Sequence, residues 1–464
     1  MKVKFVILLA IRSESYLLAR FIHSAIQMVA VLLVMAAATG HRLYGDVINP
    51  SGLSEQPKSV NSKAVQDIAE ALKSRQLGTA RDKIKELCEA DPNESHPEIV
   101  LSELLVRMGN IAEARRILDE ASLGDCDPFE LRLAFCRLAV AESRWFDGWT
   151  HAQAANGLAP PARWSSERKE RQQDDLLILS AICCEGRKDW KGVVSTLKPL
   201  LSRSPPPQAL LLCGKACFQL EQLDNAKQAL DRYCDATQTG DSAELILAKW
   251  YDGNGDSKSA EQWFLKAVET KQNQGQIKAR LTYARFLLWN NRPAEMTKWL
   301  QGDFTSPDDL KERTFLTALQ FRMQRKYADA QKILTEQHQR EPTAFPISNQ
   351  LALVLIESAD EALRSRALQI AESNVRNHAK IAEALSTLGW VQFRLGDVAS
   401  ADKSFSAAVQ NGFTTRESTY CLARVKESLG QVEMAASLRR ISQGLPGPLF
   451  SSITDAIVVD APAQ

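Results

Sequence analysis

Residues 241–271 read DSAELILAKWYDGNGDSKSAEQWFLKAVETK, and this stretch decides the fold. Apolar and small residues recur every three or four positions on both sides of Gly255, which is the period of an amphipathic helix. Ala260, Phe264 and Val268 follow one another at intervals of four. Gly255 suits the end of the first helix, because glycine readily takes the left-handed backbone that follows a helix C-terminus. The stretch therefore predicts two antiparallel helices that are joined by a tight turn.

The same template recurs along the chain at a period near 34 residues, which is typical of a repeat array. The first helix of each unit carries one residue, usually small, where the helices should cross: Ser102, Cys136, Ala181, Gly214, Ala248, Ala284, Ala318, Ala352, Gly389 and Ala423. The second helix carries its own: Ala80, Ala114, Gly148, Val193, Ala226, Ala260, Met296, Ala330, Ala367, Ala401 and Ala435. With a further unit at 61–91, the pattern predicts eleven helix pairs between residues 61 and 442.

This pattern resembles the tetratricopeptide repeat (TPR) family. Among the clearest copies are Leu388-Gly389 with Gly396-Asp397, Ala401 and Phe405, and Ala318 with Tyr327, Ala330 and Glu341-Pro342. The likeness covers about residues 61–442, although the tryptophan that the family carries early in the first helix is absent throughout. The resemblance implies an all-α solenoid whose first helices line a concave groove, and it implies protein binding.

The overall composition agrees with a soluble helical protein. Hydrophobic residues make up 45% of the 464 positions and charged residues 24%. Lysine and arginine number 57 against 56 acidic residues, so no net field is available to attract a phosphate backbone. We therefore expect no nucleic acid among the partners.

The N-terminal residues depart from the repeats. Basic residues precede an apolar stretch at 25–38 that ends in Ala36-Ala37-Ala38, which is the order of a secretory signal. Residues 1–45 are predicted to be a signal peptide or, alternatively, an uncleaved anchor that attaches the chain to a membrane; a misassigned start or a buried helix is the third interpretation. Residues 46–60 are predicted to be a linker. The array is then exported to the periplasm, the cell envelope or the extracellular space.

Two segments interrupt or follow the helical pattern. An insertion at about 158–173 combines a proline turn with a charged run, and it is predicted to lengthen one helix or to form a loop over one face. The tail at 443–464 has no helical period and is predicted to be flexible, although 453–459 could dock locally.

No residue pattern indicates catalysis or a cofactor. The six histidines are isolated, and no glycine-rich phosphate loop ending in Gly-Lys-Ser/Thr is present. The nine cysteines are an odd number. Cys183-Cys184 could meet Cys213 and Cys217 to bind a metal or form a disulfide, but their positions suit apolar packing better. We expect a protein that is not an enzyme and holds no metal or cofactor.

Binding residues are predicted from the position that follows each small residue of a first helix, which should face the groove. These residues are Arg137, Ile182, Lys215, Lys249, Arg285, Leu319, Leu353, Trp390 and Arg424. Lys215, Lys249 and Arg285 are predicted to hold carboxylates or an acidic peptide. Leu319, Leu353 and Trp390, joined by Phe393, are predicted to take apolar side chains. The alternative is that all these side chains are solvated or packed within the array.

The predicted function is that of an exported scaffold or adaptor that binds a protein or peptide in the groove. Leu211, Leu245 and Leu281 are apolar where TPR receptors of a chaperone's C-terminal carboxylate need polar groups, which argues against that role. The alternative is an accessory or regulatory subunit of an envelope enzyme or of polysaccharide or secretion machinery.

Overall fold

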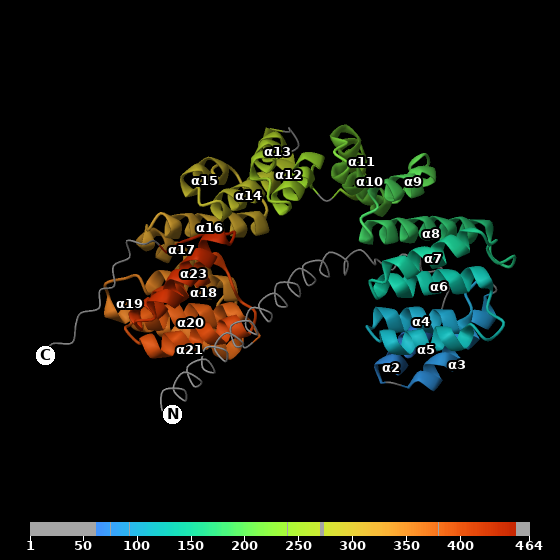
Figure 1. Ribbon diagram of the computed structural model, residues 1–464, viewed down its shortest axis with the longest axis horizontal. Coiled ribbons are helices and arrows are strands. Elements are labelled where there is room, and N and C mark those ends of the chain that lie inside the picture. The colour runs from blue at the N-terminus through green and yellow to red at the C-terminus, as the bar shows by residue number, and fades with distance from the viewer. Residues whose placement is uncertain are drawn as a thin grey trace, which may run out of the picture. The chain divides into compact units, whose positions relative to one another are not determined.

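The computed structural model describes residues 62–451, apart from 75, 92, 239, 270–272 and 379. The predicted signal segment at 1–45, the linker at 46–60 and residues 452–464 lie outside the described residues. The chain forms two compact units, which divide between Leu247 and Ala248. Within the described residues the regular elements are α-helices, coloured along the chain in Figure 1.

Unit 1 contains five complete helix pairs. They are α2 (Ser62–Lys73) with α3 (Leu77–Ala90), α4 (Pro97–Arg107) with α5 (Ile111–Ala121), α6 (Pro128–Ala141) with α7 (Trp145–Asn156), α8 (Ser166–Gly186) with α9 (Trp190–Leu201), and α10 (Pro207–Gln219) with α11 (Leu223–Thr237). The next helix, α12 (Ala243–Gly253), spans the division between the units.

Unit 2 continues the same alternation. It contains α13 (Ser257–Glu269), α14 (Asn273–Trp289) with α15 (Pro293–Leu300), α16 (Pro307–Met323) with α17 (Tyr327–Arg340), α18 (Phe345–Leu355) with α19 (Glu361–Asn377), α20 (Ala382–Arg394) with α21 (Val398–Gln410), and α22 (Arg416–Ser428) with α23 (Val432–Gly444). Across the described residues, the predicted eleven helix pairs are confirmed.

The helices cross at the small residues that the sequence pattern identified. Ala260, for example, has none of its surface exposed. At Gly389 in α20, an added Cβ would lie only 2.7 Å from the Phe405 ring in α21, so a larger residue would force the two helices apart. Within each unit, successive first helices also contact one another. Each unit is therefore a stack of helix pairs, with its core between the layers.

Most turns between the two helices of a pair contain one residue with a left-handed backbone. The glycines at this position are Gly109, Gly255, Gly396 and Gly430, and the other residues are Ser143, Lys188, Glu221, Asn291 and Arg325. Residues other than glycine rarely adopt this conformation, and asparagine is among those that tolerate it best. The turn therefore holds the residue that follows each first helix at the same end of every repeat.

The insertion at 158–173 does both things that the sequence allowed. Its second half lengthens α8 to 21 residues. Its first half is a loop at 157–165 that we call the insertion loop, and it packs through Trp164, which is 3% exposed. The Trp164 ring lies edge-on to Phe129 at a centroid distance of 6.1 Å. The main-chain N–H of Ser165 donates to Asn93 Oδ1 at 2.9 Å, so the loop is also tied to an earlier repeat.

A buried carboxylate also contacts the insertion loop. Glu130, in α6, accepts a hydrogen bond from the His96 main-chain N–H at 2.9 Å and forms an ion pair with Arg163 in the loop. Burial raises the pKa of Glu130, and these two partners act in the opposite direction. The loop is thus held by a buried aromatic side chain and by the ion pair between the exposed Arg163 and the buried Glu130.

Candidate functional site

The basic positions predicted to face a partner are largely occupied by contacts within the units. Arg137 in α6 forms ion pairs with Glu103 of α4 and Asp175 of α8. Lys215 forms an ion pair with Glu185. These partners come from neighbouring first helices, so the charges that the sequence assigned to a partner instead link consecutive repeats.

Two further basic positions lie at the start of unit 2. Arg285 in α14 forms an ion pair with Glu312 of α16, and Lys249 is exposed on α12. The Arg285 contact repeats the pattern of unit 1, in which a predicted groove residue bonds to the next first helix. The described residues therefore do not form an open strip of basic side chains.

Most of the apolar residues that were predicted to line the groove are buried. Leu319, Trp390 and Phe393 are all buried, and Trp390 and Phe393 belong to the hydrophobic core of unit 2. The Trp390 Nε1–H donates a hydrogen bond to Glu357 Oε1 at 3.2 Å. The centroids of the Trp390 and Phe393 rings lie 5.5 Å apart. Leu353 is partly buried against the same core. Burial of these rings stabilises unit 2 and leaves little of their surface for a partner.

A different surface in unit 2 is lined by polar and charged side chains that hydrogen-bond to one another. Arg322 Nη2 in α16 lies 3.9 Å from Glu417 Oε1 in α22, three repeats later, so side chains of these two first helices meet here. Arg322 also donates to Gln350 at 2.6 Å, and Asn349 donates to Glu383 at 3.0 Å. Burial raises the pKa of Glu383. We call this polar lining, which comes from first helices, the inner surface of unit 2.

The inner surface is occupied by the chain's own C-terminal residues. We call residues 445–451 the strap. The sequence predicts a flexible tail here, and the structure places the strap in contact with unit 2. The reason is that polar side chains of the helices satisfy its main-chain hydrogen-bonding groups.

Asn291 binds the strap through its side-chain amide. Its Nδ2 donates to the Gly447 carbonyl at 3.3 Å, and its Oδ1 accepts from the Leu449 N–H at 2.7 Å. Arg416 Nη1 donates to the same Gly447 carbonyl, also at 3.3 Å. Gly447 has a φ of +118°, and an added Cβ would lie 3.5 Å from the Trp289 ring. The positive φ favours a glycine at this point of the strap, whereas the distance to the Trp289 ring is an ordinary contact.

Glu417 binds the end of the strap through its carboxylate. It accepts hydrogen bonds from the N–H groups of Phe450 at 2.9 Å and of Ser451 at 3.2 Å, and from the Ser451 hydroxyl at 2.7 Å. Thr415 and Ser418 form a reciprocal capping box at the start of α22, which fixes the backbone that carries Glu417. The Arg322 guanidinium lies 4.1 Å above the Phe450 ring.

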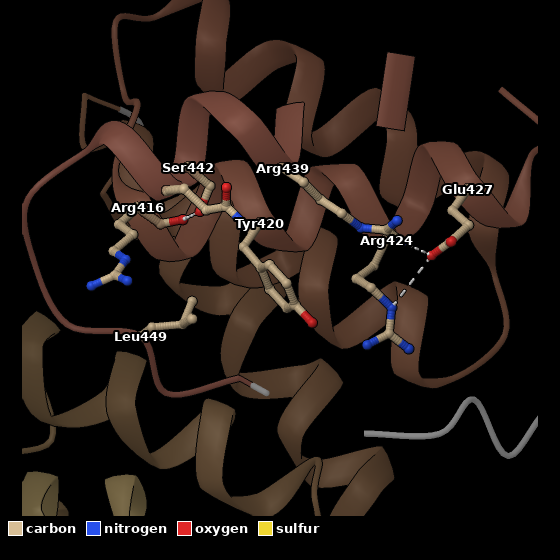
Figure 2. A pocket seen from close by; sticks show the side chains of 8 residues that line it. Arg416, Tyr420, Arg424, Glu427, Arg439, Ser442 and Leu449 are labelled. Carbon is tan, nitrogen blue, oxygen red and sulfur yellow. Dashed lines mark hydrogen bonds and ion pairs between the residues drawn. The ribbon is translucent and has the colours of Figure 1, made fainter. Parts of the chain in front are cut away.

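A cationic pocket borders the strap on the last repeat. It has a volume of about 530 Å³, and Figure 2 shows the side chains that line it. They are Arg416, Tyr420, Arg424, Glu427, Arg439, Ser442, Gln443 and Leu449. Glu427 forms an ion pair with Arg439 and lies 4.0 Å from Arg424 Nε. Arg424 and Arg439 therefore share one carboxylate, while Arg416 lies beside the strap, and we call this the arginine pocket.

Sequence reasoning found one residue of this site and missed the others. Arg424 follows the small residue Ala423, was predicted to face a groove, and lines the arginine pocket. Asn291 and Glu417 lie outside that register, one in a turn and one at a helix start. The available signal was Gly444-Leu-Pro-Gly-Pro448, which ends the last helix and favours an extended chain that could return over it.

The cysteines and other potential metal ligands do not form a site among the described residues. All nine cysteines are free thiols, and the sulfur atoms of Cys213 and Cys217 are 4.0 Å apart. No group of three histidine, cysteine or acidic residues in the described ranges is arranged to hold a metal ion. Between residues 62 and 451, none of the described helices has both the length and the apolar character required to cross a membrane.

Solved structures of TPR proteins are similar to this chain. A tetratricopeptide repeat protein from Parabacteroides merdae has 12% identity, with 68% of this chain and 99% of that chain covered and a TM-score of 0.32. The APC/C hetero-tetramer Cut9-Hcn1 has 12% identity, with coverage of 86% and 74% and a TM-score of 0.32. A human IFIT1 dimer with PPP-AAAA has 12% identity, with coverage of 75% and 90% and a TM-score of 0.33. No protein-family model and no curated protein matches the chain.

Proposed function

We propose that this chain, a TPR-like helical-repeat protein, is a non-catalytic interaction scaffold that binds an extended segment of a partner protein on the inner surface of unit 2. The strap marks the place and the conformation of that segment. A partner segment would then lie where residues 447–451 lie, in contact with Asn291, Arg416 and Glu417.

The observation that carries this proposal is that the strap is held mainly through its main chain. Asn291, Arg416 and Glu417 bond to N–H and C=O groups of Gly447, Leu449, Phe450 and Ser451. Every peptide segment offers these groups, so the same side chains can bind a segment of different sequence. A hydrogen bond to a charged group contributes about 1.5–3 kcal/mol, which suits the reversible capture of a peptide.

The test uses the full chain and a peptide with the sequence of residues 444–451, GLPGPLFS, labelled with a fluorophore. Phe450→Ala weakens the resident strap by removing its contact with Arg322, and it leaves the groove residues intact. We expect this variant to bind the peptide more tightly than the unmodified chain does, as measured by fluorescence anisotropy.

The control adds Glu417→Lys to Phe450→Ala, which replaces the acceptor of two strap N–H groups with a cation. This double variant should lose binding of the peptide while circular dichroism shows an unchanged helix content. Equal binding by the Phe450→Ala variant with and without Glu417→Lys contradicts the proposed site.

We also propose that the scaffold acts outside the cytoplasm, on the strength of the basic residues and the apolar stretch at 25–38. A cleaved signal predicts a mature protein that begins near Ala38, and an anchor predicts an intact N-terminus in the membrane fraction. Mass analysis of the mature N-terminus decides between these alternatives, and an intact chain in the cytosol contradicts both.

A further inference from the structure

Two side chains at the end of the strap make contacts that depend on their chemical type. The Arg322 guanidinium lies over the Phe450 ring, 4.1 Å from the ring centroid. The Ser451 hydroxyl donates a hydrogen bond to Glu417 Oε1 at 2.7 Å. Any segment can form the main-chain hydrogen bonds of the strap, whereas these two contacts require particular side chains. They are therefore the part of the site that can distinguish one sequence from another.

The position of Phe450 favours an aromatic ring. Arg322 is 5% exposed, donates to Gln350 at 2.6 Å and has Nη2 3.9 Å from Glu417 Oε1. A guanidinium is attracted to the face of an aromatic ring, and this attraction is stronger where water is excluded. An aliphatic side chain of similar size would bury as much apolar surface but would lose the attraction. A segment bound in the register of the strap therefore gains affinity from an aromatic residue here.

The position of Ser451 favours a small side chain that can donate a hydrogen bond. Ser451 is 6% exposed, and its hydroxyl oxygen lies 3.8 Å from the sulfur of Cys421, which is 3% exposed. Little room is left there for a longer side chain. The ionised carboxylate of Glu417 only accepts hydrogen bonds, so it pairs with a hydroxyl. A second carboxylate at this position would instead meet a like charge.

We propose that the partner segment carries an aromatic residue followed directly by serine, and that Glu417 rejects segments with a negative charge at the serine position. This inference rests on the proposed function and describes its partner by two adjacent side chains. The strap carries the same pair, so it competes with the partner for both contacts. Because the strap is tethered, it is present at high effective concentration and excludes segments that lack either side chain.

The experiment compares labelled peptides that carry a C-terminal amide, so that no terminal carboxylate adds a charge. They are GLPGPLFS, GLPGPLFA, GLPGPLFD and a form of GLPGPLFS with cyclohexylalanine in place of phenylalanine. Each is titrated into the full chain that carries Phe450→Ala, with fluorescence anisotropy as the readout. The resident strap competes equally with all of them, so the ratios of their affinities depend on the peptides alone.

We expect the alanine peptide to bind about tenfold more weakly than GLPGPLFS, because a hydrogen bond to a charged group is lost. The aspartate peptide should bind about tenfold more weakly again, because two carboxylates then face each other. The cyclohexylalanine peptide should bind about fivefold more weakly than GLPGPLFS, because its ring has the size of phenylalanine but no π face for the guanidinium.

The matched variant adds Glu417→Gln to Phe450→Ala. Glutamine keeps the length of the side chain and one acceptor oxygen but removes the charge, so the gap between the aspartate and alanine peptides should close. An aspartate penalty that survives Glu417→Gln would show that Glu417 does not reject the charge. If all the peptides bind equally well, the aromatic and serine preferences are wrong and the proposed function stands. If none of them binds the Phe450→Ala variant, the proposed function fails and this inference fails with it.

Discussion

The insertion loop of unit 1 and the strap of unit 2 both leave the helical repeats and return to pack on them, but they are held by opposite means. The insertion loop is anchored by a side chain, Trp164, which is 3% exposed, and by the ion pair between Arg163 and the buried Glu130. The strap is held mostly through its N–H and C=O groups. A buried indole fits only the cavity that its own ring fills. Main-chain hydrogen bonds, in contrast, can be formed by another segment of different sequence.

The largest expected effect tests the anchored loop. Trp164→Ala should lower the free energy of unfolding by about 3–5 kcal/mol, because it removes a buried aromatic ring and leaves a cavity beside Phe129. Urea denaturation followed by circular dichroism measures this change. Phe146→Ala, at a ring that is 64% exposed, is the control and should cost far less. Similar losses for the two variants would show that the loop is not an anchored part of unit 1.

The next effect concerns the charges that the sequence assigned to a partner. Lys215→Glu places a second carboxylate beside Glu185, whose side chain is 7% exposed. We expect a loss of about 2 kcal/mol, and therefore a lower melting temperature, because a nearly buried charge loses its partner and meets a like charge. The swapped pair Glu185→Lys with Lys215→Glu should recover much of that loss. An unshifted melt would favour the original prediction that Lys215 serves a partner.

A smaller effect tests the exchangeable strap. Glu417→Gln removes the charge that accepts from Phe450 and Ser451, and it should cost about 1 kcal/mol in stability. The effect on the strap should be larger than the effect on unit 2 as a whole. Amide hydrogen exchange at Phe450 and Ser451 should accelerate, while the amides in the middle of α22 stay protected. Hydrogen exchange with mass spectrometry measures both, with the exposed Glu433→Gln as control. Uniformly faster exchange throughout unit 2 would mean that the strap is an integral part of the fold.

The smallest effect is a pH dependence of the anchored loop. Burial raises the folded-state pKa of Glu130 above its ordinary value of 4.5, so the folded chain binds this proton more tightly than the unfolded chain does. The resulting contribution to stability is fully present below that ordinary value and is lost as the pH rises through the folded-state pKa. Glu130→Gln should therefore flatten the stability profile over this interval. A profile that Glu130→Gln leaves unchanged would show that this carboxyl titrates normally.

The sequence predicted the helix pairs well because their determinants are local. Small residues such as Ala260 and Gly389 mark crossings between helices that are adjacent in the chain, and the structure buries them there. The binding residues depended on a rule about which side of a first helix faces outward. At Trp390, which that rule assigned to a partner, the structure buries the indole in the core, where it bonds to Glu357.

The strap site could not be predicted from the repeat pattern because its contacts join distant parts of the chain. Asn291 and Gly447 are 156 residues apart, and periodicity carries no information about a segment that lies outside the repeats. Arg424, which the repeat register predicted to face a groove, lines the arginine pocket. The charge of the arginine pocket, in contrast, depends on Arg416 and Arg439, which come from other positions of the last helix pair.

The left-handed turn at Asn291 has a consequence for engineering the protein. Glycine in place of Ser143 or Lys188 would relieve an unfavourable backbone and is expected to toughen the array by a fraction of a kcal/mol to about 1 kcal/mol each. The same change at Asn291 would relieve the backbone of that turn, but it would remove the side-chain amide that forms hydrogen bonds with the strap. Thermal stability and affinity for an extended segment would then change in opposite directions, so a consensus redesign that standardised every turn would yield a more stable protein that binds such a segment less tightly.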